Sequence, residues 1–296
     1  MHRLIRVELV KIWRRRLNWV TLGVVLVLIV TVYVLLWVAS GVIDPEQRRI
    51  LREDIPISDL RSVLFLEDAV PFALTMLYEI GLLGVVVVVG ANVGSEYAWN
   101  TLRTNVAAYP DRIELMVAKL IALGVAVVAG MLVGLVVSLL TSTVITVIDG
   151  GFTLEFVDLE FLEHSLYSFL RLLLQGAPYF ALAVLGATWG RSATSGISIA
   201  VGFLFLETIV ASLMTLAGGW VSNVPDLLLS RNADSLSQLA GGTFRDDLAQ
   251  ITQASGFGEV FEFPDPLQSG IVLAVWTVVF TVAALVRFHR QDLGYQ

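Results

Sequence analysis

Cysteine is absent from the 296 residues, and only two of the 19 basic residues are lysines, Lys11 and Lys119. Without cysteine the chain can form no disulfide, thiol nucleophile or cysteine-ligated metal site. The three histidines, His2, His164 and His289, are far apart in the sequence, which argues against a histidine-built metal centre. Two lysines also leave almost no candidate for a side chain that cradles a phosphate.

Common catalytic motifs are missing as well. The sequence contains no G-x-x-x-x-G-K-[ST], H-E-x-x-H, G-x-S-x-G or G-x-G-x-x-G pattern. The chain therefore cannot hydrolyse ATP through a P-loop of its own, and we expect it not to be an enzyme and to bind no cofactor. If its work needs ATP, a second polypeptide must supply the nucleotide site.

Apolar residues are abundant instead. They make up 56% of the chain, against roughly 45–50% in soluble domains even with glycine counted, and the mean hydropathy is +0.80. Six runs are long enough to cross about 30 Å of hydrocarbon, which predicts an all-α polytopic membrane protein. The predicted spans are 17–38, 70–93, 120–148, 166–189, 196–216 and 270–286.

Two of these spans need an argument. The first follows a basic stretch, as a signal peptide does, but a secretory h-region has only about 7–15 apolar residues, so we expect an uncleaved span. The fourth and fifth are divided only by a turn at 190–195. We separate them because one unbroken helix would be about twice as long as a bilayer is thick.

Arginine and lysine are distributed unequally between the two sides of this topology. Twelve of the 19 fall on the side that holds both termini, and seven fall in the longer loops opposite. The positive-inside rule then predicts a protein of the cytoplasmic membrane with both termini in the cytoplasm. The acidic excess lies outside, which argues against nucleic-acid binding. The expected cytoplasmic parts are 1–16, 94–116 and 289–296, and the longest outer loop is 217–269.

Residues 1–16 carry an apolar stripe at helical spacing, with basic residues beside it. The stripe predicts an amphipathic helix in the membrane interface. Such a helix can be only an anchor and topology signal, or it can also contact a partner. The stripe is Ile5, Leu9, Ile12 and Trp13, and the residues off it are Arg3, Lys11, Arg14 and Arg15.

The loop 94–116 has a helical pattern of its own. Leu102, Val106 and Tyr109 repeat at helical spacing until Pro110, which lacks an amide proton and breaks the pattern. This spacing predicts a short helix near the membrane. It is either a generic loop helix or an element that docks on another protein.

Residues 96–103, Glu-Tyr-Ala-Trp-Asn-Thr-Leu-Arg, are followed by Asp111-Arg112 and by Lys119 at the start of the third span. Together they resemble the E-x-x-x-G-T-L-R … R … K pattern of ABC-2 type transporter permeases. The start of the chain, Glu8-Leu9-Val10-Lys11 and then Arg14-Arg15-Arg16, is similar to bacterial members of that family. Asn100 stands where the family usually has glycine, and a helix N-cap accepts either residue.

The resemblance implies the permease of an exporter that has two permease and two ATPase halves. The cytoplasmic loop of such permeases supplies a coupling helix, which fits into a cleft of a separate ABC ATP-binding subunit. The partner subunit would bind ATP and Mg, and the second permease would be another copy or a related chain. The coupling residues would be Glu96, Thr101, Leu102, Arg103 and Val106.

Two carboxylates, Glu79 and Glu207, fall inside predicted spans. An ionisable group costs about 2.5–3.5 kcal/mol at the centre of an inserted helix, which makes it a functional candidate by default. These residues could line a substrate path or relay protons, or each could be neutral or paired, for instance with Arg171. An ion-coupled secondary transporter and a membrane scaffold are therefore the alternative functions.

Small residues recur every four positions in two spans. They are Ala126, Gly130 and Gly134 in the third span, and Gly186 and Gly190 in the fourth. Such spacing lets helices approach closely. We expect these stripes to pack within the chain, and a dimer contact is the alternative.

Overall fold

The computed structural model describes residues 1–42, 63–66, 68–99, 101, 111–149, 157–217, 219–239 and 264–291. Every regular element in these ranges is a helix. Six helices are long and apolar enough to cross a membrane, which confirms the predicted all-α, six-span class. The central part of the predicted coupling segment, 102–110, lies outside the described residues.

The helices follow the predicted order along the chain. The second span is built from three consecutive segments, because a short π-helical turn interrupts it at Leu77–Gly81. The elements are α1 (His2–Arg14), α2 (Arg16–Val42), α5 (Ala69–Met76), η1 (Leu77–Gly81), α6 (Leu82–Ala98), α8 (Arg112–Ile148), α9 (Leu159–Gly190), α10 (Ala193–Ala217), η2 (Gly219–Leu227), α11 (Leu229–Gln238) and α13 (Pro266–His289).

Each predicted span lies inside an observed helix that extends beyond it. Aspartate caps explain where three of the helices begin. Asp111 accepts hydrogen bonds from the amides of Ile113 and Glu114 at the start of α8, and Asp158 and Asp265 cap α9 and α13. Such caps satisfy amides that have no partner within the helix. Hydropathy thus marks the apolar middle of a span, and the aspartate cap marks the residue at which the helix begins.

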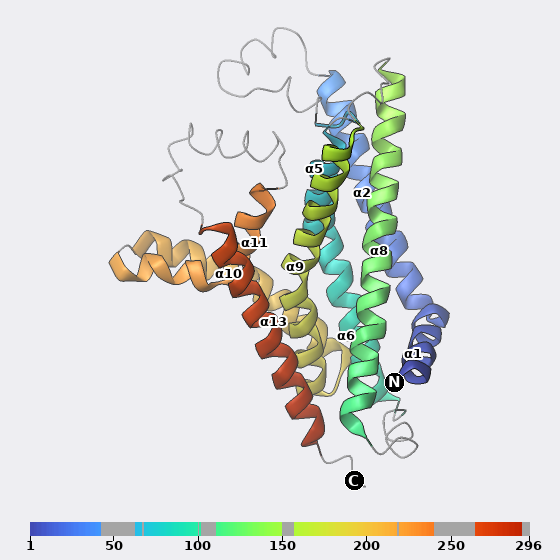
Figure 1. The fold of residues 1–296 in the computed structure, drawn as a ribbon, viewed down its shortest axis with the longest axis vertical. Coiled ribbons are helices and arrows are strands. Elements are labelled where there is room, and N and C mark those ends of the chain that lie inside the picture. Colours follow the sequence, from blue (N-terminus) through green and yellow to red (C-terminus); the bar gives the residue numbers. More distant parts are fainter. Residues whose placement is uncertain are drawn as a thin grey trace.

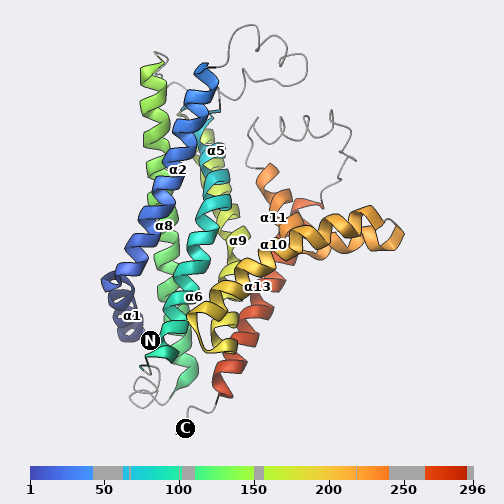
Figure 2. The same ribbon diagram turned by 180° about the vertical axis from the view of Figure 1, so that it is seen from behind.

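The helices form a bundle that is open on one side. Helices α2, α6, α8 and α9 run alongside one another, whereas α10 leaves the bundle and extends sideways (Figures 1 and 2). The N-terminus and the last turns of α13 lie at the same end (Figure 1), and this end is called the foot below. The inner spans are the second span and α9, each 61% buried in its most apolar stretch, against 11–22% for the other four.

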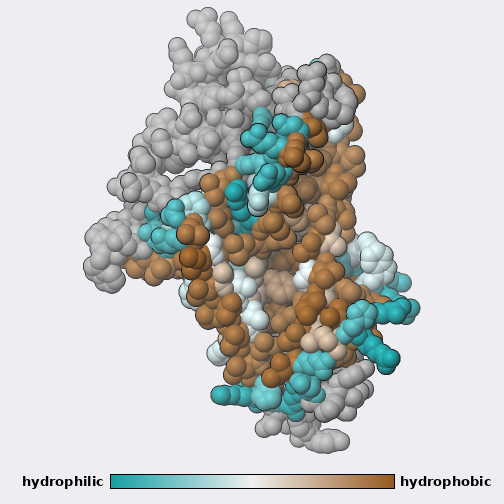
Figure 3. Space-filling model, in the orientation of Figure 1, coloured by the Kyte–Doolittle hydropathy of each residue, from teal (hydrophilic) through white to brown (hydrophobic). Residues whose placement is uncertain are grey.

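The outer surface of the bundle suits lipid. Hydrophobic side chains cover its middle, and hydrophilic ones gather around the foot (Figure 3). Large apolar residues such as Val24, Leu140 and Val278 are more than half exposed. This distribution fits a membrane-embedded chain whose outer spans face acyl chains.

Glycine allows α6, α9 and α10 to approach closely near the foot. A Cβ placed on Gly90 would lie 2.9 Å from a side-chain carbon of Ile197 in α10. A Cβ on Gly186 of α9 would lie 3.1 Å from the carbonyl oxygen of Ser195. The stripe at Gly186 and Gly190 is therefore used for packing within the chain.

Candidate functional site

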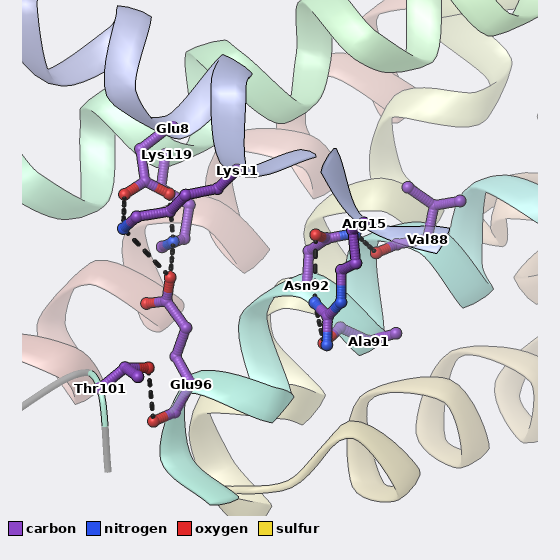
Figure 4. A network of polar contacts seen from close by, with 9 residues as sticks. All are labelled: Glu8, Lys11, Arg15, Val88, Ala91, Asn92, Glu96, Thr101 and Lys119. Carbon is purple, nitrogen blue, oxygen red and sulfur yellow. Dashed lines mark hydrogen bonds and ion pairs between the residues drawn. The ribbon is translucent and has the colours of Figure 1, made fainter. Parts of the chain in front are cut away.

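Four charged side chains meet at the foot, and they include both lysines of the protein. We call Glu8, Lys11, Glu96 and Lys119 the charge cluster (Figure 4). Lys119 Nζ lies 2.5 Å from Glu8 Oε2 and 2.6 Å from Glu96 Oε1. Lys11 Nζ lies 2.5 Å from Glu8 Oε1 and 3.6 Å from Glu96 Oε1. The cluster joins α1, α6 and α8, and its formal charges cancel.

Three members of the cluster are buried. Glu8, Glu96 and Lys119 are 3%, 8% and 4% exposed, while the side chain of Lys11 is 40% exposed. Burial by itself raises the pKa of Glu8, but the charges and hydrogen bonds of Lys119 and Lys11 outweigh it and hold that pKa below its ordinary value. Burial lowers the pKa of Lys11, but Glu8 and Glu96 raise it more, so the net shift is upward. Both residues are therefore charged at neutral pH.

The face of α1 that packs on the bundle differs from the predicted apolar stripe, because it includes Glu8. The buried line runs through Leu4, Glu8 and Ile12 and packs on α8, while Trp13 of the predicted stripe is exposed. An acid can occupy this line because two ammonium groups neutralise it.

Glu96 lies in the last turn of α6, two residues before its end. Its Oε1 binds Lys119, whereas no group among the described residues donates a hydrogen bond to its buried Oε2. Its backbone carbonyl faces the hydroxyl of Thr101 at 3.5 Å. A buried carboxylate oxygen without a donor is costly, and this one lies where the chain enters residues 102–110.

A second group of contacts clamps the α1–α2 bend to α6. Arg15 Nη1 donates to the carbonyl of Ala91 and to Asn92 Oδ1, both at 3.1 Å. Asn92 Nδ2 donates to Asn18 Oδ1 at 2.8 Å. The guanidinium of Arg15 also lies 4.8 Å from the ring centre of Trp99, within the range of a cation–π contact. The start of α2 is thereby fixed to the end of α6.

Gln291 connects the chain after α13 to the same region. Its amide nitrogen donates to the carbonyl of Thr188 in α9 at 2.5 Å, and its Oε1 accepts from the hydroxyl of Tyr97 at 3.1 Å. Its backbone carbonyl accepts from Arg112 Nη1 at 2.8 Å. The lower ends of α6, α8, α9 and α13 are therefore linked by polar contacts.

The structure describes only part of the predicted coupling element. Glu96 and Thr101 are described and lie at its entrance, while Leu102, Arg103 and Val106 lie outside the described residues. Glu8 and Lys119 belong to the site although we did not predict them as site residues. Two signals were available: both residues stand in the motifs noted at 8–16 and 96–119, and lysine occurs at only two positions, which bind the same two carboxylates.

The two intramembrane acids have different surroundings. Glu207 is 4% exposed and accepts hydrogen bonds from the amides of Leu229 and Ser230 at the start of α11 and from the hydroxyl of Tyr179. Arg171 instead donates to the carbonyl of Leu239. Glu207 thus holds α11 against α10 and α9.

Glu79 is exposed and lies in the π-helical turn η1. Single π-turns inside α-helices are rare and occur frequently at functional sites. Of the two acids, Glu79 is the one whose carboxylate is open to the surface of the chain.

No family model matches this sequence, and no curated protein matches it at a significant level.

Proposed function

We propose that this chain is the permease subunit of an ABC-2 type transporter, working as an exporter with separate ATP-binding subunits and a second permease. The sequence resemblance of residues 96–119 motivates the proposal. The single observation that carries it is the charge cluster, because Glu96 and Lys119 flank residues 102–110 and bind each other at 2.6 Å. A partner that moves this segment therefore acts on α6 and α8 together.

The cluster gives such a movement a route into the membrane. Glu8 also binds Lys119, so a displacement at the foot reaches α1 as well as α6 and α8. Arg15 and Asn92 extend the connection to the start of α2. Buried ion pairs suit this use, since their short, directional contacts keep the helix ends in register. The role of these residues is mechanical, and the chemistry of ATP hydrolysis belongs to the partner.

Glu96 Oε2 offers a contact for the coupling segment. Within the proposed function, a basic group of the ATP-binding subunit donates to this oxygen. This donor would remove the cost of the unsatisfied buried carboxylate oxygen. Engagement of the partner would then be linked directly to the pair formed by Glu96 and Lys119.

The two intramembrane acids have different roles in this proposal, one structural and one in transport. Glu207 supports α11, whereas exposed Glu79 borders the substrate path. An ion-coupled carrier that used both acids would have to free Glu207 from two backbone amides and Tyr179 in every cycle. A permease driven by a separate ATPase does not require Glu207 to leave these donors.

Purification of the chain from its native membrane in a gentle detergent tests the proposal. We expect an ATPase with a P-loop to accompany it. The double variant Leu102→Asp with Arg103→Glu should reduce the co-purified ATPase activity at least about tenfold, because it reverses the character of the docking face. A tenfold change corresponds to about 1.4 kcal/mol of binding free energy.

The chain offers a matched control in the predicted outer loop, where Leu51→Asp with Arg52→Glu makes the same two changes. This variant should keep the ATPase at the wild-type level. Purification of the wild type without any nucleotide-binding chain would overturn the proposal. So would equal ATPase activity in the two double variants.

A further inference from the structure

An apolar groove opens between α2, the second span and α8, beside the end of α1. Its volume is about 410 Å³, within the roughly 300–1,000 Å³ typical of small-ligand sites. The floor contains the buried side chains of Leu77, Val85 and Met131, and the rim contains the exposed side chains of Trp13 and Val125. The groove is therefore open to the surroundings of the bundle and closed toward its core.

Four glycines line the groove, and one of them leaves part of its space open. Gly81 and Gly84 line the groove from the second span, and Gly130 and Gly134 line it from α8. A Cβ on Gly130 would meet a single neighbouring atom, 3.9 Å away in Leu22. The third-span stripe is therefore tightly packed at Gly134, where a Cβ would lie 2.5 Å from a side-chain carbon of Leu77, and leaves unfilled volume at Gly130.

The groove is long and almost entirely apolar. It follows α8 from Val125 to Gly134, roughly 13 Å along the helix at 1.5 Å per residue. This length corresponds to about one leaflet of a hydrocarbon core that is about 30 Å thick. Asn18, one of its few polar residues, donates to the carbonyl of Ile12. An extended acyl chain fits such a site.

The mouth of the groove is aromatic, and basic residues stand beside it in the sequence. Trp13 and Trp19 line it with their rings 4.5 Å apart, and tryptophan is enriched at the level of lipid headgroups. Arg14 and Arg16 are exposed and lie between the two tryptophans in the sequence. Residues 1–42 contain a single acid, Glu8, which is buried and paired. The uncompensated charge at the mouth is therefore positive.

We propose that this groove binds one anionic phospholipid from the leaflet at the foot, with an acyl chain along α2 and α8 and the headgroup at Arg14 and Arg16. A second copy of the chain is a poorer occupant. A two-fold contact through the groove brings the same surface from both subunits together, and the arginines of the two α1 helices would then face each other. The proposal does not depend on the proposed transport function.

Native mass spectrometry of the full-length chain in detergent tests it, with phosphatidylglycerol and phosphatidylcholine added in parallel. We expect one phosphatidylglycerol to be retained under conditions that remove phosphatidylcholine. Gly130→Leu fills the groove and should abolish this retention. Gly124→Leu is the matched control on α8, because a Cβ there also meets open space but lies outside the groove, and it should retain the lipid.

Two further variants separate the chain site from the headgroup site. Ala129→Phe blocks the groove from its exposed side and should also abolish retention, so the result does not rest on one substitution. Arg14→Gln with Arg16→Gln should lower the preference for phosphatidylglycerol by roughly fivefold for each arginine removed. Inorganic phosphate at millimolar concentration should not displace the lipid, because it lacks the acyl chain.

Three results would overturn the proposal. One is equal lipid retention in Gly130→Leu and Gly124→Leu, at matched thermal stability. Another is equal retention of phosphatidylglycerol and phosphatidylcholine by the wild type. The third is loss of a dimer in Gly130→Leu with unchanged lipid retention, which would assign the groove to a second copy.

Discussion

Glu8 at the foot and Glu207 in the middle of α10 are both buried carboxylates, yet the protein stabilises them in different ways. Glu8 binds two ammonium groups at 2.5 Å. Glu207 binds two backbone amides and a tyrosine hydroxyl, and no basic side chain among the described residues forms an ion pair with it. One carboxylate is neutralised by cations, and the other is held by neutral donors.

The difference follows from what each location can supply. The foot lies among the hydrophilic side chains (Figure 3), where the side chain of Lys11 still reaches water. A lysine inside the apolar part of a span would be as costly as the acid that it neutralises. The start of α11 instead provides amides that need an acceptor in any case. At the foot, lysines link the helices through Glu8 and Glu96. In the middle of α10, Glu207 holds α11 through backbone amides.

The largest expected effect comes from Lys119→Met, which leaves two carboxylates buried at the foot with only the half-exposed Lys11. Removing one partner of a buried ion pair costs about 3–5 kcal/mol in the free energy of unfolding. Thermal unfolding of the purified protein should show this loss. Lys11→Met, in the same cluster, should cost less than about 1 kcal/mol, because its partners are also bound by Lys119 and its own side chain is solvated.

Equal destabilisation by Lys119→Met and Lys11→Met would show that burial does not set the energetics of the cluster. The combined variant Glu8→Gln, Glu96→Gln and Lys119→Met should recover most of the stability, since no unpaired buried charge remains. Glu163→Gln, an exposed acid at the start of α9, is the control and should leave unfolding unchanged.

The next effect is expected at Glu207. Glu207→Leu leaves the amides of Leu229 and Ser230 without their acceptor and should cost about 2 kcal/mol. Glu207→Gln keeps an acceptor oxygen and should cost less than about 1 kcal/mol. Glu207→Leu should also speed thiol labelling of Leu236→Cys, because Leu236 of α11 is only 5% exposed, and the labelling has no background because the chain has no cysteine.

Equal losses from Glu207→Gln and Glu207→Leu would contradict this account, because both variants remove the negative charge and only Glu207→Gln keeps an acceptor for the two amides. Hydrogen bonds would then not explain how the protein stabilises Glu207, and the difference from Glu8 would be lost.

Most of the fold could be predicted because its determinants are local in the sequence. A span is a continuous apolar run, and the aspartates that cap α8, α9 and α13 lie directly beside these runs. The all-α class and the six spans therefore follow from hydropathy. The π-turn at Glu79 could not be predicted, since nothing in the local pattern of residues 77–81 sets it apart from the α-helix on either side.

The site depends on contacts that are distant in the sequence. Glu8 and Lys119 are 111 residues apart, so the residues near Glu8 cannot reveal that it is buried. Glu207 is harder still to interpret, because its donors at Leu229 and Ser230 are backbone amides, which every residue except proline has. Two usable signals for the cluster were the motifs at 8–16 and 96–119, which contain all four residues, and the restriction of lysine to two positions.

The smallest expected effect is the pH dependence of the cluster, which sharpens its assignment as an ion pair. The pKa of Glu8 is lowered from an ordinary value of about 4.3, so its contribution to stability is present above that pH and is lost as the pH falls through the lower, folded-state value. The pKa of Lys11 is raised from about 10.4, so its contribution is present below that pH and is lost as the pH rises through the higher value. The difference in thermal midpoint between the wild type and Glu8→Gln should therefore stay constant from about pH 5 to 9 and shrink below about pH 4. A change between pH 5 and 9 would require a titrating group in contact with Glu8 other than the lysines that bind it.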